Sequence, residues 1–222
     1  MPRRSHIAVK LARNLTPQDL ATKLGSSYGG LSSKAASLEV PLRDKSALME
    51  IYNVKSLPRE VKDWIWELFE SNMKSLYQQS EDGWDPADKR KELFHVESRF
   101  CVLRSNDLSI ESDGQKNRLL GYTIFRFDTE ETAGDEEADV VYCYELQVES
   151  NAHGQGVGRL LMDRLERIGK ATKMDKTMLT VFKANGSATS FYEKIGFVVD
   201  EIDPSNYEES DEVDYKILSK PC

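Results

Sequence analysis

The sequence predicts an α/β protein, with a mixed central β-sheet flanked by helices and an N-terminal extension in front. Strand-like and helix-like segments follow one another along most of the chain, which is typical of helices packed on such a sheet. The 222 residues are 39% hydrophobic and 31% charged, a composition typical of a globular protein. Three cysteines and three histidines are widely spaced, so neither a disulfide framework nor a zinc site is indicated.

The N-terminal residues 1–55 show no sustained hydrophobic period. Residues 25–33 are mostly Gly and Ser, which leave little to bury and favour a flexible linker. Scattered apolar residues such as Leu20 and Leu38 would let the segment lie along a domain surface. We therefore expect a partly extended arm over 1–55, packed on a single domain over 56–222.

Two helices are expected at the start of this domain. Between Pro58 and Tyr77, apolar residues recur at spacings of three and four, which is the pattern of an amphipathic helix with one buried face. Asp85 followed by Pro86 is typical of a helix start, because an acidic N-cap accepts backbone hydrogen bonds and proline suits the first helical position. A second, shorter helix should therefore begin there.

Strands and helices then alternate. The runs 99–104 and 119–127 are separated by turn residues, so they should pair as an antiparallel hairpin with a long loop. An acidic loop follows at 130–139. The remaining expected elements are a strand at 140–148, a helix at 157–172, a strand at 177–182, a helix at 187–195, and strands at 197–199 and 213–218.

The charge pattern limits the classes of partner. A formal net charge of −8 and a pI near 5.1 disfavour unspecific binding to nucleic acid or to an anionic membrane surface. No apolar run approaches the roughly 20 residues of a membrane span, and the N-terminus lacks the apolar segment of a secretory signal. We expect a soluble intracellular protein with a cationic partner, with no direct contact to nucleic acid or membrane.

The most informative segment is a strand that ends in a glycine-rich turn and opens a helix, residues 142–159. Glycines let the backbone approach a ligand closely, and the first free N–H groups of a helix suit a pyrophosphate. The turn lacks the Gly-Lys-Ser/Thr of a Walker A loop and the third glycine of a dinucleotide fingerprint. A glycine turn without any ligand is the competing interpretation.

This turn, His153-Gly-Gln-Gly-Val-Gly158, resembles the acetyl-CoA pyrophosphate loop of the GNAT acetyltransferase superfamily, whose pattern is Arg/Gln-x-x-Gly-x-Gly/Ala. The first position departs from the pattern, since it is His. A second block, Asn185 to Phe197, resembles the helix and turn that flank the pantetheine in that superfamily. The resemblance implies the GNAT fold, acetyl-CoA as cosubstrate and no metal.

A narrower resemblance covers roughly residues 58–219. Strings such as Tyr77-Gln-Gln-Ser-Glu-Asp-Gly-Trp84, Tyr142-Cys-Tyr-Glu145 and Met178-Leu-Thr-Val-Phe-Lys183 are similar to the N-terminal acetyltransferases of histones H-4 and H-2A. The resemblance implies direct transfer, in a ternary complex, of an acetyl group to the α-amine of a Ser-Gly-Arg-Gly terminus. It further implies basic histone tails as partners, a monomer that acts without an auxiliary subunit, and a location in cytoplasm and nucleus.

Two competing functions remain open at this point. A GNAT enzyme can instead acetylate lysine side chains or small amines. The chain can also be a catalytically silent module that binds acetyl-CoA or a histone tail.

The resemblance also assigns the cofactor site. Leu146, Gln147 and Val148 would contact acetyl-CoA by their main chain, and Asn185 would reach it as well. The pyrophosphate would lie against the turn and the helix start, formed by Gly154, Gln155, Gly156, Val157, Gly158 and Arg159.

Glu145 is the candidate general base. An α-amine has a free pKa of about 7.7–8.0, so a base must take a proton before or during attack. An acid within an apolar strand is costly unless it is used or paired, and a structural pair with an arginine such as Arg126 is the competing interpretation. In strict alternation Tyr144 and Glu145 face opposite ways, so we expect a β-bulge there.

The remaining site residues follow from the resemblance. Tyr192 would be a general acid toward the leaving thiolate, or would pack on the pantetheine. Acidic residues would pair the substrate arginine and aromatic residues would enclose its small first residues, although Asp128 and Glu130 could equally be solvated loop charges. The substrate-contacting positions are Tyr77, Asp128, Thr129, Glu130, Tyr144, Thr180 and Tyr215.

Overall fold

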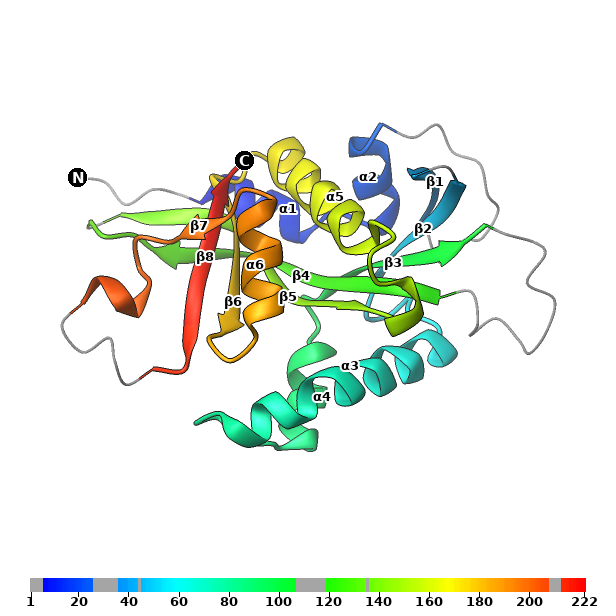
Figure 1. Ribbon diagram of the computed structural model, residues 1–222. Helices are drawn as coiled ribbons and strands as arrows, with labels where there is room; N and C mark the ends of the chain where they lie inside the picture. Colours follow the sequence, from blue (N-terminus) through cyan, green and yellow to red (C-terminus); the bar gives the residue numbers. More distant parts are fainter. Residues whose placement is uncertain (1–5, 26–35, 44, 107–118, 135, 208–212) are drawn as a thin grey trace.

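The computed structural model describes residues 6–25, 36–43, 45–106, 119–134, 136–207 and 213–222 (Figure 1). Eight strands form one mixed sheet in the order β1-β2-β3-β4-β5-β6-β8-β7. Neighbouring strands are antiparallel except β5 and β6, which are parallel. The predicted mixed sheet is therefore confirmed. The strands are β1 (Ala36–Leu42), β2 (Lys45–Asn53), β3 (Arg99–Ser105), β4 (Leu119–Glu131), β5 (Glu137–Val148), β6 (Lys176–Phe182), β7 (Val198–Val199) and β8 (Tyr215–Pro221).

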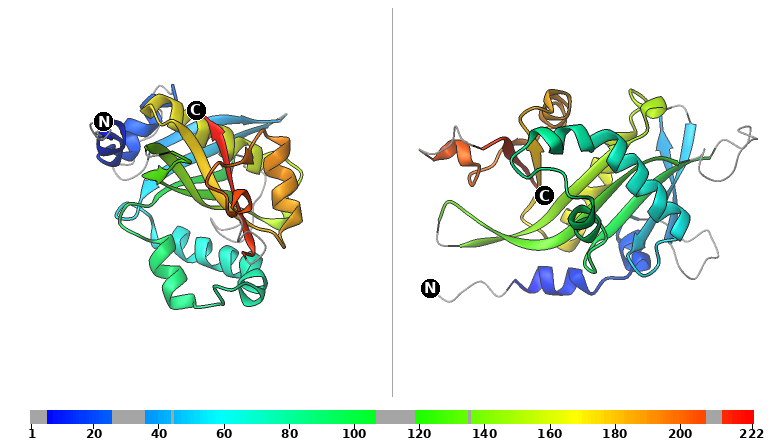
Figure 2. Two further views of the ribbon diagram at one scale, coloured as in Figure 1. Left: turned by 90° about the vertical axis from the view of Figure 1, so that its left-hand side faces the viewer. Right: turned by 90° about the horizontal axis from the view of Figure 1, so that it is seen from below.

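Helices cover both faces of the sheet (Figures 1 and 2). One face carries α3 (Arg59–Gln79) and α4 (Pro86–Leu93). The other carries α1 (Ile7–Arg13), α2 (Pro17–Lys23), α5 (Val157–Thr172) and α6 (Gly186–Lys194). Two short 3-10 turns, Ser150–Ala152 and Pro204–Asn206, complete the described elements.

Two hydrophobic cores result from the alternation of side chains along the strands. On β3, Phe100 and Val102 pack under α3 and α4, while Cys101 and Leu103 join the core on the α5 side. This is the period of two that a strand buried on both faces requires. The sheet is therefore a central layer between two sets of helices.

The helices predicted at the start of the domain over 56–222 have clear local causes. α3 buries one side at spacings of three and four and follows Pro58, as the period predicts. α4 begins where expected, because the carboxylate of Asp85 accepts hydrogen bonds from the backbone N–H groups of Ala87 and Asp88. The expected hairpin is present as the antiparallel pair β3 and β4, although most of its loop, 107–118, lies outside the described residues.

The acidic segment differs from the expected loop. β4 continues to Glu131 and β5 begins at Glu137, and the pairing of these two residues closes a much shorter connection. Some of the acidic residues of 130–139 therefore lie on paired strands. The exposed side of a strand tolerates such polar side chains.

The first 55 residues hold more regular structure than the sequence indicates. They contain α1, α2 and the hairpin of β1 and β2, and β2 pairs with β3 from Ala47 to Asn53. α2 begins with a capping box in which Thr16 and Asp19 bond each other's backbone N–H groups. Most of the Gly- and Ser-rich stretch, 26–33, lies outside the described residues.

Gly121 allows the sheet and α5 to come close together. A Cβ atom at this position would lie 2.7 Å from the carbonyl oxygen of Gln147 and 2.9 Å from a methyl group of Val157. Glycine is therefore required for β4 to pack directly against the end of β5 and the start of α5. None of the helices in the described ranges combines the length and apolar character that a membrane span requires.

Candidate active site

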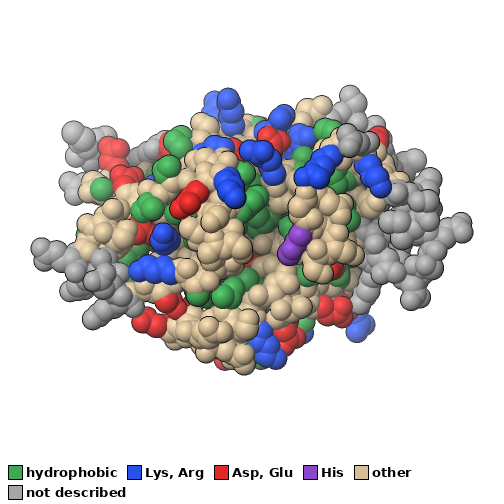
Figure 3. Space-filling model, in the orientation of Figure 1, with side chains coloured by type: hydrophobic (Ala, Val, Ile, Leu, Met, Phe, Trp, Pro, Cys, Tyr) green, Lys and Arg blue, Asp and Glu red, His purple; other side chains and the backbone are tan. Residues whose placement is uncertain are grey.

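The site begins where β5 separates from β6. The parallel register of these strands ends at the pair Cys143 and Leu179, while β5 continues to Val148. From Tyr144 onward, the edge of β5 that faces β6 has no strand partner in the described part of the chain. A cavity of about 1310 Å³ opens along this edge, between α3 on one side and α5 and α6 on the other. Figure 3 shows the hollowed face, with Lys and Arg side chains gathered along its upper edge, over α5.

A β-bulge in β5 places two functional side chains on the same face. Ile124 pairs with Glu145 and Phe125 pairs with Cys143, so Tyr144 has no partner on β4. The hydroxyl of Thr123 donates to the backbone oxygen of Glu145 at 2.9 Å. The predicted bulge is confirmed. It turns both Tyr144 and Glu145 toward the α3 side of the sheet.

Glu145 is buried in the cavity wall. Burial is the largest cause that raises its pKa, to about 7. The negative charge of Glu92 acts in the same direction, while the hydrogen bond from Gln147 and the charge of Lys89 act against it. A carboxylate that titrates near neutral pH is matched to proton transfer from an amine.

The alternative role of Glu145, a structural pair with Arg126, is contradicted. The guanidinium of Arg126 lies 3.9 Å from the ring centre of Tyr144 and donates to the hydroxyl of Ser98 and to the carbonyl of Glu92. No ion pair joins Arg126 to Glu145 among the described residues.

The glycine turn and the start of α5 form an open set of backbone donors. Gly154 and Gly156 have φ values of 71° and 91°, a region that side chains disfavour. No side chain caps the first N–H groups of α5. The ring of His153 is within hydrogen-bond distance, 3.1 Å, of the carbonyl oxygen of Val148. The turn is therefore shaped to accept an anion through its backbone.

The predicted cofactor residues lie together with one exception. The cavity is lined by Leu146, Gln147, Val148, Gly154, Gly156, Val157, Gly158, Arg159 and Asn185. Gln155 does not line it, because its amide donates to the backbone oxygen of Asn151 at 2.7 Å. Asn185 caps α6, and its side-chain oxygen accepts a hydrogen bond from the backbone N–H of Ala188.

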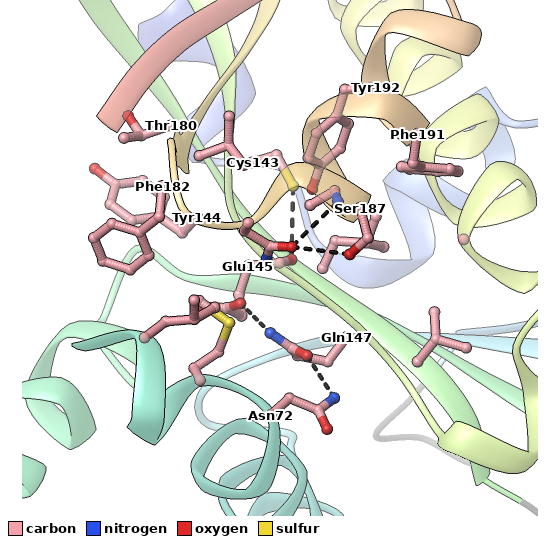
Figure 4. Close-up of a pocket in the computed structure, with 18 of the residues that line it drawn as sticks. Asn72, Cys143, Tyr144, Glu145, Gln147, Thr180, Phe182, Ser187, Phe191 and Tyr192 are labelled. Atoms are coloured by element: carbon pink, nitrogen blue, oxygen red, sulfur yellow. Dashed lines mark hydrogen bonds between the residues drawn. The ribbon is translucent and has the colours of Figure 1, made fainter. Parts of the chain in front are cut away.

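Tyr192 stands on α6 with its hydroxyl pointing into the cavity, close to Cys143 in Figure 4. Burial raises the pKa of this phenol well above its ordinary value, and the neighbouring Cys143 and Glu145 add to the effect. The hydroxyl group therefore stays protonated at any physiological pH and can donate a hydrogen bond.

The opposite end of the cavity collects most of the predicted substrate residues, which are Tyr77, Glu130, Tyr144, Thr180 and Tyr215. The Thr180 hydroxyl bonds the phenol of Tyr142. Burial, followed by the charge of Asp128, raises the pKa of Glu130. This end combines aromatic rings with a carboxylate.

Two predicted substrate residues, Asp128 and Thr129, lie outside the cavity lining. The carboxylate of Asp128 accepts a hydrogen bond of 2.8 Å from Arg13 of α1 and another of 2.9 Å from the backbone N–H of Thr129. The long-range pair with Arg13 had no signal in the sequence, because these residues are 115 positions apart.

Several lining residues had no assigned role in the sequence. Asn72 on α3 donates at 2.8 Å to the side-chain oxygen of Gln147. Lys89 of α4 lies 4.2 Å from the ring centre of Tyr77 and pairs with Glu92 at 3.0 Å. Asn72 is exposed to the cavity, and a polar residue three positions after the buried Phe69 of an amphipathic helix is the one signal that could have been followed. The described residues hold no group of three or more His, Cys, Asp or Glu arranged to bind a metal.

Comparison with known proteins gives consistent results. A model described as "Acetyltransferase (GNAT) family" matches residues 59–197. Arabidopsis thaliana NAA60, solved with a bisubstrate analogue, has a similar fold, with a TM-score of 0.56, 10% identity and coverage of 78% of this chain and 99% of that chain. The NatC complex bound to Gag peptide and CoA has a TM-score of 0.53 at 18% identity, covering 79% and 98%. PaiA N-acetyltransferase from Thermoplasma acidophilum, solved with coenzyme A, has a TM-score of 0.51 at 16% identity, covering 78% and 99%.

Proposed function

Because the chain belongs to the acetyltransferase (GNAT) family, we propose that it is a NatD-type enzyme that acetylates the N-terminal α-amine of histones H-4 and H-2A. The acetyl group would pass directly from acetyl-CoA to a Ser-Gly-Arg-Gly terminus within a ternary complex. The observation that carries this proposal is Glu145, buried where β5 leaves β6, with a pKa raised to about 7.

The backbone around the glycine turn supports the fit of acetyl-CoA. Gly154 and Gly156 leave room for a pyrophosphate beside the uncapped N–H groups of α5. The free edge of β5 at Leu146 to Val148 can hold the pantetheine arm by main-chain hydrogen bonds. A backbone N–H near Leu146 can also stabilise the negative charge that develops on the acetyl oxygen.

Glu145 takes up the proton, and Tyr192 assists the leaving group. Glu145 removes a proton from the α-ammonium, directly or through a water, and so frees the nitrogen lone pair for attack on the thioester carbon. As the new C–N bond forms and the C–S bond breaks, the electron pair passes to sulfur, and the second proton lost from the nitrogen ends on that sulfur to give the free coenzyme thiol. Tyr192 donates a hydrogen bond toward that sulfur or packs on the pantetheine; its raised pKa favours hydrogen bonding over full proton transfer.

The other end of the cavity supports a small, basic chain terminus. Tyr77, Tyr144 and Tyr215 line it and can enclose Ser and Gly, while Glu130 supplies a carboxylate for an arginine. The NatC complex, of similar fold, was solved with a peptide and CoA together, which supports a peptide acceptor. We further propose a monomer without auxiliary subunit, acting on histone tails in cytoplasm and nucleus.

Acceptor specificity is tested with three acceptors assayed side by side. They are a Ser-Gly-Arg-Gly peptide, the same peptide with a blocked N-terminus that carries an internal lysine, and a polyamine. We expect acetylation of the free peptide alone. Labelling only of the blocked peptide or the polyamine would overturn the N-terminal assignment, and peptide binding without turnover at any pH would indicate a silent binding module.

The role of Glu145 is tested in the same assay. We expect Glu145→Gln to lose most of kcat, on the order of 100-fold, while it still binds acetyl-CoA. In the unmodified protein, kcat should rise with pH through about 7, because the base acts only when it is deprotonated. Turnover of Glu145→Gln near that of the unmodified protein would remove Glu145 from the mechanism.

A further inference from the structure

Two side-chain amides form a continuous hydrogen-bonded path from α3 to the candidate base. Asn72 donates from Nδ2 to Oε1 of Gln147 at 2.8 Å, and Gln147 donates from Nε2 to Oε1 of Glu145 (Figure 4). Gln147 and Glu145 are both buried, with exposed fractions of 6% and 9%. The path therefore links the cavity side of α3 to the proton-transfer site.

We propose that Asn72 and Gln147 are positioning residues for Glu145, which fix the rotation of its carboxylate and leave the second oxygen free to take the substrate proton. This inference rests on the proposed acetyl transfer, in which Glu145 is the base. It goes beyond it, since neither amide touches the reacting atoms in that mechanism.

Both hydrogen bonds of the path run in the same direction, with the donor on the Asn72 side and the acceptor on the Glu145 side. An amide donates through nitrogen and accepts through oxygen, so the bond from Asn72 to the oxygen of Gln147 turns the nitrogen of Gln147 toward Glu145. That nitrogen stabilises the ionised carboxylate and lowers its pKa, against the larger effect of burial. Asn72 thus acts on Glu145 through the orientation of a second side chain.

Other groups face Glu145, and their effects must be separated from that of the amides. Lys89 and Glu92 approach from α4, Tyr77 from α3, Tyr122 from β4 and Tyr192 from α6, while Cys143 is its neighbour on β5. Lys89 and Glu92 form an ion pair with each other at 3.0 Å, so their opposite charges largely cancel at Glu145. The two amides are the uncharged groups that can be changed without altering this balance.

Three variants separate positioning from simple packing. Gln147→Met keeps the length and removes the donor. Asn72→Leu removes the bond that orients Gln147 and adds no charge. Gln78→Met, an exposed amide on α3 outside the cavity lining, is the matched control.

The readout is the pH profile of kcat, with the KM for acetyl-CoA measured alongside. We expect the acidic limb to move to higher pH in Gln147→Met by about one unit, which lowers kcat near pH 7 up to tenfold and lets most of it recover at pH 9. Asn72→Leu should move the limb in the same direction by no more than Gln147→Met does, and KM for acetyl-CoA should change less than about twofold. An unchanged limb in Gln147→Met, or a larger shift in Asn72→Leu than in Gln147→Met, would overturn the proposal.

A second measurement keeps this test independent of the acceptor. The pKa of Glu145 is read without substrate from the difference in carboxylate infrared absorption between the protein and its Glu145→Gln variant. A rise of that pKa in Gln147→Met supports the positioning role even if histone termini prove not to be acceptors. No change in the pKa contradicts it even if they are.

Discussion

At the scale of single residues, the site depends on a carboxyl group held in surroundings that disfavour its negative charge. Glu145 lies among the side chains of a sheet and two helices, and this environment raises its pKa to about 7. Charged groups avoid such surroundings unless the charge is used. The same burial that makes Glu145 a fitting base should therefore lower the stability of the protein at neutral pH.

We expect Glu145→Gln to raise Tm at pH 8 and to leave it unchanged at pH 4. The pKa of the folded state, about 7, lies above the ordinary value near 4.3 of an unfolded glutamate, so the folded state holds the proton longer. Stability from this group is present below about pH 4 and is lost as pH rises through about 7. Each kcal/mol recovered at pH 8 corresponds to about 2–4 °C in thermal unfolding. A lower Tm for the variant at pH 8 would contradict the buried-charge argument.

Glu130 and Asp128 provide a matched pair of acids for the substrate end. Glu130 lines the cavity, whereas the carboxylate of Asp128 is bonded to Arg13. We expect Glu130→Gln to raise KM for a Ser-Gly-Arg-Gly peptide about tenfold, since a buried carboxylate and guanidinium pair is strong, and Asp128→Asn to raise it less. With a peptide in which norleucine replaces Arg, the two variants should no longer differ in KM. A larger effect of Asp128→Asn would assign the arginine to Asp128 instead.

At the scale of elements, the sequence predicted the helices and strands of residues 56–222 and missed those of the first 55 residues. α3 shows its buried side over 21 residues, so its pattern is unambiguous. α1 and α2 have 7 residues each, too few to show a helical period, and β1 follows a stretch rich in Gly and Ser. The bulge in β5 was predictable because Tyr144 and Glu145 needed the same face, whereas the contact of Arg13 with Asp128 depends on tertiary packing alone.

The hairpin of β1 and β2 brings an unforeseen cation to the glycine turn. The Nε atom of Arg43 is 3.8 Å from the point where a Cβ of Gly156 would lie, and Arg43 lines the cavity. The ring of His153, which replaces the cationic or amide residue of the family pattern, is instead close to the Val148 carbonyl. We expect Arg43→Ala to raise the Kd for acetyl-CoA about three- to tenfold, because it removes a charge near the phosphates.

Calorimetric titration with acetyl-CoA and with its 3′-dephospho form measures this effect and identifies the phosphate. A loss seen only with the intact cosubstrate assigns Arg43 to the 3′-phosphate, and an equal loss with both assigns it to the pyrophosphate. Arg59→Ala is the control, since that side chain is 94% exposed and lies outside the cavity lining. Equal affinities for Arg43→Ala and the control would rule out the contact.

At the scale of the whole molecule, the N-terminal elements share one core with the catalytic sheet. Val9, Leu20 and Leu38 are buried together with residues of β4, β5 and α5. His6 bonds the carboxylate of Asp139 and lies 3.0 Å from that of Glu137, so α1 is also tied to the start of β5. Unfolding should therefore be a single cooperative transition.

Two leucines in the N-terminal part test whether the N-terminal elements unfold together with the rest of the protein. Leu20 is 0% exposed and Leu11 is 65% exposed. We expect Leu20→Ala to lower the free energy of unfolding by about 2–5 kcal/mol through the cavity it leaves, and Leu11→Ala to change it by less than about 0.5 kcal/mol. Denaturant unfolding followed by both tryptophan fluorescence and circular dichroism measures the loss. A separate early transition in Leu20→Ala would show that the N-terminal elements unfold on their own.

The position of β8 has a consequence for how the protein matures during translation. β8 lies between β6 and β7 in the sheet although it follows both in the sequence, and it carries Tyr215 and Ile217 of the cavity wall. A nascent chain that has emerged only as far as β7 therefore has an unpaired strand and an incomplete acceptor end. Activity should therefore arise only when β8 has emerged from the ribosome and paired with β6 and β7.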